Sequence, residues 1–169
     1  MLAKDEARYL ERAIELALLA EQEGNCPIGA VITLDGRILG EGGNRIASPH
    51  YDPGRHAEIE ALRRVPPEAW ERAPEMTCYT SLEPCVMCTG TLLLHGVGRV
   101  VFGSTDVGGG GGAILAHLPP FFEGSASVPD WIGPVAPERC DPLFERARAI
   151  FRELPVGRQR LRRSKDSRT

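Results

Sequence analysis

Residues 76–104 predict a strand, a helix and a second strand joined by short connections, and this unit restricts the fold more than any other part of the chain. "MTCYTS" (76–81) and "RVVFGS" (99–104) are short apolar runs typical of buried strands. "CVMCTGTLLLHG" (85–96) is helical in character and ends on a glycine, which suits the conformation that follows a helix. Strands connected in this way pair in parallel through a right-handed crossover. The stretch therefore predicts an α/β fold.

Segments before this unit add a hairpin and a helix. "IGAVITL" (28–34) and "RILGEG" (37–42), joined by Asp35 and Gly36, predict two antiparallel strands. An amphipathic helix is expected over residues 5–23, with an apolar face formed by Leu10, Ile14, Ala17 and Leu18. The predicted architecture is a three-layer αβα arrangement, one mixed sheet with helices on both faces.

Two further helices are expected. "HAEIEALRRV" (56–65) predicts a helix that stops before the prolines at 66 and 67. The last helix is expected to start at Asp141 as its cap, with Pro142 as the first helical residue. Between the glycine run 108–112 and residue 140, only a short helical stretch around 114–118 is predicted.

Length and charge predict one domain with a basic tail. A chain of 169 residues with 42% apolar positions can bury one sizeable core, which we place in residues 1–155. Residues 156–169 hold six basic side chains and one acidic one, which leaves 14 basic and 22 acidic for residues 1–155. The body is therefore at −8 and the tail at +5. Without apolar periodicity, the tail is expected to be disordered, either a nucleic-acid arm or a solubilising end.

The opening residues and the cysteines indicate where the protein resides. "MLAKDEARYLER" is charged throughout, unlike a secretory signal, and no apolar run approaches the roughly 20 residues of a membrane span. We therefore expect a cytoplasmic protein. Thiols stay reduced there, so five cysteines do not predict a disulfide framework.

"HAE" (56–58) and "PCVMC" (84–88) carry the chemistry. Cys85 and Cys88, three apart on the first turn of a helix, can place both sulfurs on one metal ion. His56 would supply a third ligand. Residues two apart on a helix point in different directions, so His56 and Glu58 converge only if the motif straddles a helix start. One nitrogen and two sulfurs leave the fourth position of a zinc ion for water, as in catalytic sites, and Glu58 is the natural proton carrier.

H-x-E followed by P-C-x-x-C is typical of zinc nucleobase deaminases. Over residues 7–106 the sequence resembles the cytidine deaminase superfamily, and most of all the branch with tRNA adenosine deaminases and bacterial guanine deaminases. The resemblance implies a Zn²⁺ cofactor, a five-stranded sheet and a homodimer. It implies His56, Cys85 and Cys88 as ligands and Glu58 as the acid/base residue. It also implies substrate contacts, which we assign to Asn44, Ala57, Ser81, Glu83 and Asp106.

Competing interpretations stay open at this point. C-x-x-C also occurs in redox proteins, although that interpretation leaves "HAE" unexplained. A fourth ligand would make the site structural; the residues available for it are Cys26, Cys78, Cys140, His50, His95 and His117. Trp131 is either a lid over a flat base or, as we expect, the anchor of a surface loop. The glycine run is expected to be a mobile segment near the mouth of the site.

The substrate prediction is a free aminated base or nucleoside, with an amino-purine such as guanine preferred over a pyrimidine. A body at −8 opposes nucleic-acid binding, and the family pattern ends after Asp106. A tRNA-specific adenosine deaminase is the alternative, which a cluster of Arg45, Arg55, Arg63 and Arg64 would favour. A second alternative, a zinc-bound but inactive partner subunit, has no need of Glu58. Arg55, directly before the histidine, is expected to alter the pocket rim or a dimer contact.

Overall fold

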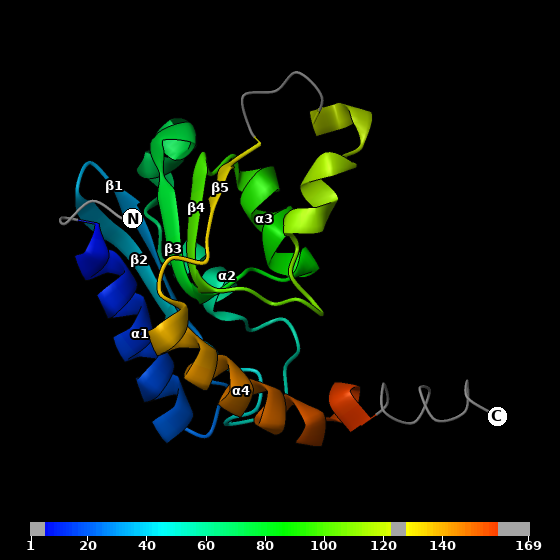
Figure 1. The fold of residues 1–169 in the computed structure, drawn as a ribbon. Coiled ribbons are helices and arrows are strands. Elements are labelled where there is room, and N and C mark those ends of the chain that lie inside the picture. Colours follow the sequence, from blue (N-terminus) through cyan, green and yellow to red (C-terminus); the bar gives the residue numbers. More distant parts are fainter. Residues whose placement is uncertain (1–5, 123–127, 159–169) are drawn as a thin grey trace.

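The computed structural model describes residues 6–122 and 128–158, which are built around a five-stranded sheet in the order β2-β1-β3-β4-β5 (Figure 1). The strands β2, β1 and β3 are antiparallel neighbours, whereas β3, β4 and β5 run parallel. The bounds are β1 (Gly29–Leu34), β2 (Arg37–Gly43), β3 (Thr77–Leu82), β4 (Arg99–Ser104) and β5 (Asp130–Ile132). The predicted mixed sheet is confirmed.

Helices cover both faces of the sheet, which confirms the three layers. Figure 1 shows α1 and α4 together on one face and α2 and α3 on the other. Apolar side chains of β1, β3 and β4 point alternately into the two interfaces, so each face has its own core. The helices are α1 (Ala7–Gln22), α2 (Ala57–Leu62), α3 (Val86–His95) and α4 (Pro137–Glu153), with 3₁₀ turns at Pro67–Glu75, Gly112–Ala116 and Pro120–Phe122. None of the described helices is long and apolar enough to cross a membrane.

The hairpin and the crossover lie where the sequence predicts them. Asp35 and Gly36 have φ of 49° and 73°, the left-handed pair that a two-residue hairpin turn requires. β3 and β4 are joined by α3, which ends on Gly96 at φ 74°. The parallel pair then places the carboxyl ends of both strands at the same edge of the sheet as the start of α3.

Three helix predictions need correction. Leu18, assigned to the buried face of α1, is 41% exposed, while Leu10, Ile14 and Ala17 are buried. α2 ends at Leu62 rather than at Val65, because the N–H groups of Arg64 and Val65 bond only three residues back, to Ala61 O and Leu62 O, so the last turn before Pro66 is tighter than an α-helix.

α4 begins at Pro137, five residues before Pro142, the predicted first helical residue, and Pro142 lies inside it. Burial explains the earlier start, because Ala136 and Cys140 pack against α1. Asp141 does not cap the helix; its Oδ1 accepts a 2.6 Å hydrogen bond from Ser104 Oγ at the end of β4.

Two segments lie outside the sequence prediction. The resemblance implies five strands, which the sheet confirms, but the residues of β5 were not assigned, because it has only three residues between segments rich in proline and glycine and is held by pairing with β4. Residues 155–158 form a helical turn, so the chain is ordered past the predicted boundary at 155. Of the tail predicted to be disordered, residues 156–169, the part from 159 to 169 lies outside the described residues.

Candidate metal centre

The predicted ligands lie at the starts of two helices. His56 is the N-cap of α2 and Cys85 the N-cap of α3, both with extended backbone at ψ 157° and 172°. Neither side chain makes the hydrogen bond by which a cap usually satisfies the first turn, so both are available to a metal. Cys88 follows in the first turn of α3. The expectation that the histidine motif straddles a helix start is confirmed.

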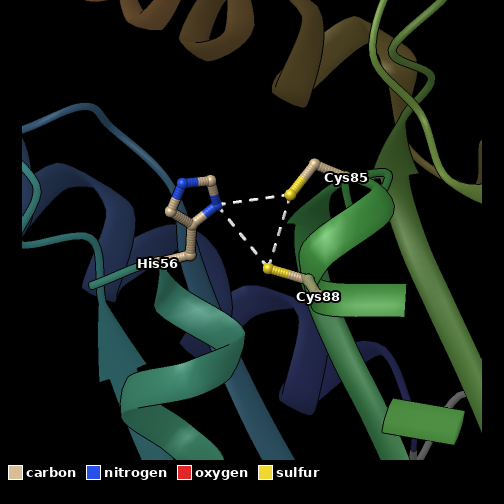
Figure 2. A group of neighbouring side chains, drawn as sticks. All are labelled: His56, Cys85 and Cys88. Atoms are coloured by element: carbon tan, nitrogen blue, oxygen red, sulfur yellow. Dashed lines mark hydrogen bonds between the residues drawn. The ribbon is translucent and has the colours of Figure 1, made fainter. Parts of the chain in front are cut away.

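The three ligand atoms are spaced as a tetrahedral zinc ion requires. His56 Nδ1 faces both sulfurs, at 3.5 Å from Cys85 Sγ and 3.6 Å from Cys88 Sγ, and the sulfurs are 3.7 Å apart (Figure 2). Tetrahedral bonds of about 2.3 Å to sulfur and 2.05 Å to nitrogen give edges of about 3.8 Å between sulfurs and about 3.6 Å between sulfur and nitrogen. The geometry and the donor set therefore both fit zinc.

Charge at the site favours a thiolate. Hydrogen bonding with Cys88 and then with His56 lowers the pKa of Cys85 to about 4, against the effect of burial. The same Cys85 contact, together with burial, raises the pKa of Cys88 well above its ordinary value. Burial lowers the pKa of His56, but the hydrogen bond and charge of Cys85 outweigh it and raise that pKa overall.

Glu58 lies beside the ligands and is 3% exposed. Its Oε2 accepts a 3.3 Å contact from the Cys88 thiol, and its Oε1 accepts a 3.2 Å hydrogen bond from Thr80 Oγ1. Burial raises the pKa of Glu58, as expected for a carboxyl group that exchanges protons near neutral pH. The contact to Thr80 was not predicted from the sequence.

Within the described residues, the structure supports neither a disulfide between Cys85 and Cys88 nor a fourth protein ligand. Cys85 and Cys88 are free, and their separation of 3.7 Å exceeds the roughly 2.05 Å of a disulfide bond. Among the described residues, the metal-binding group contains only His56, Cys85 and Cys88. Cys78 lies in the core, and the Cys26 thiol contacts a backbone carbonyl.

The predicted substrate contacts Glu83 and Asp106 both accept hydrogen bonds from backbone N–H groups of residues 106–112. Glu83 accepts hydrogen bonds from the N–H groups of Asp106 and Gly112, at 3.1 and 3.3 Å. The Asp106 carboxylate accepts from the N–H groups of Gly108 and Gly109. Both carboxylates therefore fix the path of residues 106–112.

The glycine run packs tightly against residues 84–88, which carry Cys85 and Cys88 and are called the metal loop below. Gly111 N–H donates a 2.7 Å hydrogen bond to Pro84 O, and Gly110 forms a β-bridge with Cys85. A Cβ atom added to Gly111 would lie 2.0 Å from Thr89 Oγ1, and one added to Gly110 would lie 2.4 Å from Glu83 Oε2. The expectation of a loose segment gives way to a close backbone approach that only glycine allows.

The other predicted substrate residues are buried. Asn44 Oδ1 accepts a hydrogen bond from Ile46 N–H at 3.1 Å, and no hydrogen bond from its amino group is recorded within the described residues. Ser81 Oγ accepts from Gly29 N–H at 3.1 Å and so serves the sheet. Ala57 is fully buried at the start of α2.

Arg55 and Trp131 have structural contacts. Arg55 makes two 3.0 Å hydrogen bonds to the buried carboxylate of Glu60, and this pairing accounts for an arginine directly before His56. Trp131 packs on Phe102 with ring centres 5.7 Å apart, which supports the anchoring role over the lid.

Comparison with known proteins connects this centre with nucleobase chemistry. The family model of the cytidine and deoxycytidylate deaminase zinc-binding region matches residues 3–104. A tRNA-specific adenosine deaminase of Bacillus subtilis is 33% identical over 92% of this chain and 94% of its own length. A protein of the same description from Haemophilus influenzae is 43% identical over 59% of this chain, which spans only 58% of that relative.

Solved structures share the fold. One from studies of A-to-I editing by tRNA:A34 deaminases has a TM-score of 0.65 and 32% identity, covering 76% of this chain and 98% of that one. A guanine deaminase from Bacillus subtilis has a TM-score of 0.52 and 26% identity, covering 82% and 91%. Proteins of one architecture thus carry names for two kinds of substrate.

Proposed function

Since the chain belongs to the cytidine and deoxycytidylate deaminase zinc-binding family, we propose that it is a hydrolytic deaminase of an aminated nucleobase. One observation carries the proposal: the buried Glu58 carboxylate contacts Cys88, one of three side chains that can hold zinc and leave its fourth position open. A zinc-bound but inactive partner subunit would have no use for a buried acid there.

The reaction replaces an exocyclic amino group by oxygen. Zinc, when held by His56, Cys85 and Cys88, makes water a nucleophile near neutral pH. Glu58 takes a proton from the attacking water and passes it to a ring nitrogen of the base. A second proton goes to the departing amine, so that one water is consumed and one ammonia released for each oxo-base formed. Asn44, with its recorded contact only through Oδ1, can offer its amino group to the edge of the base.

We propose a free base or nucleoside, with an amino-purine such as guanine preferred, as the substrate class. Residues 1–155 carry 14 basic and 22 acidic side chains, which opposes a polyanionic partner. One of the four arginines of the expected basic cluster, Arg45, also has a carboxylate of its own, that of Glu23.

A tRNA adenosine deaminase is the second candidate, and two observations favour it. The Bacillus subtilis relative that matches nearly its full length is named for that activity. Arg55, Arg63 and Arg64 share the single carboxylate of Glu60, so this corner of α2 keeps surplus positive charge. Such a patch suits a phosphate backbone.

Ammonia release tests the reaction and the substrate together. The zinc-loaded protein is offered free purines, free pyrimidines, nucleosides and a tRNA transcript, with Glu58→Gln as the control. Release from a free base or nucleoside supports the preferred class, and inosine formed only in tRNA supports the second candidate. If nothing in the set releases ammonia above the Glu58→Gln background, the proposed reaction is wrong.

We also propose a homodimer. α3 exposes Val86 and Met87 in its first turn and Leu94, at 71%, in its last turn. Exposed apolar side chains along a helix are available to an interface with a second copy of the chain. Light scattering after size exclusion measures the mass directly; a monomer at micromolar concentration would contradict this part of the proposal.

A further inference from the structure

Thr80 stands out because it is a polar side chain on an otherwise apolar face of the sheet. It lies in the middle of β3, paired with Ala30 on one side and Phe102 on the other. Both neighbours belong to the core beneath α2 and α3, as does Cys78 two residues earlier on the same face. Thr80 itself is fully buried.

Packing alone does not account for this hydroxyl. Valine has the same shape and an equal preference for strands, and it would bury no polar atom. A buried hydroxyl costs free energy unless it makes a hydrogen bond. The recorded partner of Thr80 Oγ1 is Glu58 Oε1, at 3.2 Å.

The two oxygens of Glu58 are therefore held differently. Oε2 takes its contact from the Cys88 thiol, at 3.3 Å. Cys88 is one of the three candidate zinc ligands, whereas Thr80 is outside the metal-binding group. Thr80 is thus the contact of Glu58 that has no second task at the metal.

We propose that Thr80 is a positioning residue for the proton carrier: its hydroxyl fixes Oε1 of Glu58 and leaves Oε2 directed at the metal ligands. This inference rests on the proposed function, since it assigns the orientation of Glu58 during deamination. Thr80 thus influences turnover from the rigid centre of the sheet, although it neither binds the metal nor contacts the substrate.

Kinetics of three variants test the role. Thr80→Val removes the hydroxyl and keeps the shape, and Thr80→Ser keeps the hydroxyl. Thr33→Val removes a hydroxyl whose hydrogen bond, among the described residues, goes to the backbone of Thr77. We expect Thr80→Val to lower kcat roughly tenfold or more, the scale of one lost hydrogen bond to a charged group, with KM and zinc content unchanged. Thr80→Ser should recover most of kcat, and Thr33→Val should leave it unchanged. A Thr80→Val variant with kcat within twofold of the unmodified protein, or one impaired only through KM or zinc loss, would overturn the proposal.

Cobalt(II) in place of zinc gives a measurement that does not depend on turnover. Its visible absorption follows the surroundings of the metal. We expect Thr80→Val to shift the bands of the unmodified protein and to add no shift in a Glu58→Gln background, because the effect passes through Glu58. Equal spectra for Thr80→Val and the unmodified protein, or an equal shift in both backgrounds, would refute the positioning role. If the unmodified protein releases no ammonia from any substrate, the proposed function fails, and these spectra still decide the part played by Thr80.

Discussion

Replacing Gly111 by alanine should disturb the metal centre without touching a ligand. The backbone of Gly111 has a negative φ of −88° with ψ −5°, an allowed conformation for alanine, so the main effect is steric. The added Cβ would lie 2.0 Å from Thr89 Oγ1, 2.8 Å from Thr89 Cβ and 3.0 Å from Cys85 O. Thr89 cannot rotate away, because it is β-branched, fully buried and bonded to Pro84 O at 3.2 Å.

Relief of this overlap must displace the turn that carries Cys85. Overpacking of this kind costs about 1–3 kcal/mol, which for a domain of this length lowers Tm by roughly 2–4 °C per kcal/mol. If about 1.4 kcal/mol of the cost falls on the ligand geometry, the zinc dissociation constant rises tenfold.

Gly108→Ala is the matched control. A Cβ atom at Gly108 would meet only Asp106 Oδ1, at 3.8 Å, so this change should be neutral in both measurements. Chelator competition measures zinc affinity, and calorimetry measures Tm. Equal values for the two variants would show that the glycine run does not press on the metal loop, and the packing argument would then be wrong.

The remaining predictions concern the centre and the ion pairs around it. Glu58→Gln should lower turnover by at least roughly 10²–10⁴ while zinc and fold persist, as measured by ammonia release and metal analysis; near-normal activity would exclude the proton-carrier role. The unmodified protein should hold one zinc per chain and Cys85→Ala much less, whereas Cys26→Ala, outside the metal group, should hold a full complement. Burial alone would raise the pKa of Glu60, but hydrogen bonds and charge from Arg55 outweigh it and lower that pKa, so the stabilisation is complete above the unfolded value of about 4.3 and is lost as pH falls through the folded value. Urea unfolding should therefore show the gap between the unmodified protein and Glu60→Gln to be wide at pH 7 and narrow below pH 4; a constant gap would contradict the linkage.

Local signals explain which parts of the fold were predictable. The strand at Arg99–Ser104 and the helix ending at Gly96 coincide with their predicted bounds, because apolar runs and a glycine stop act within a few residues. β5 and the start of α4 depend on partners far along the chain. Asp130–Ile132 becomes a strand by pairing with β4, and burial of Cys140 against α1 extends α4 backwards.

The residues of the metal centre also differ in whether the sequence predicts their roles. The ligands and Glu58 follow from motif spacing at helix starts, which is a local property. Thr80 and Gly111 do not, since their roles come from contacts with Glu58, 22 residues away, and with the metal loop. In the sequence, Thr80 is noticeable only as a hydroxyl-bearing residue in an otherwise apolar strand, whose side chains alternate between two buried faces. The assignments of Glu83 and Asp106 as substrate contacts stay predictions, although both carboxylates now have backbone partners.

Because His56 and Cys85 lie far apart along the chain, the stability of the folded protein depends on the concentration of free zinc. These residues are 29 positions apart, so the unfolded chain presents the two cysteines together but not the complete set. An ion that binds the native state in preference adds about 1.4 kcal/mol of stability for each tenfold rise of its free concentration above the dissociation constant. Reported melting temperatures of this protein will thus be comparable only at a buffered zinc concentration, and in a cell its abundance should follow the zinc supply.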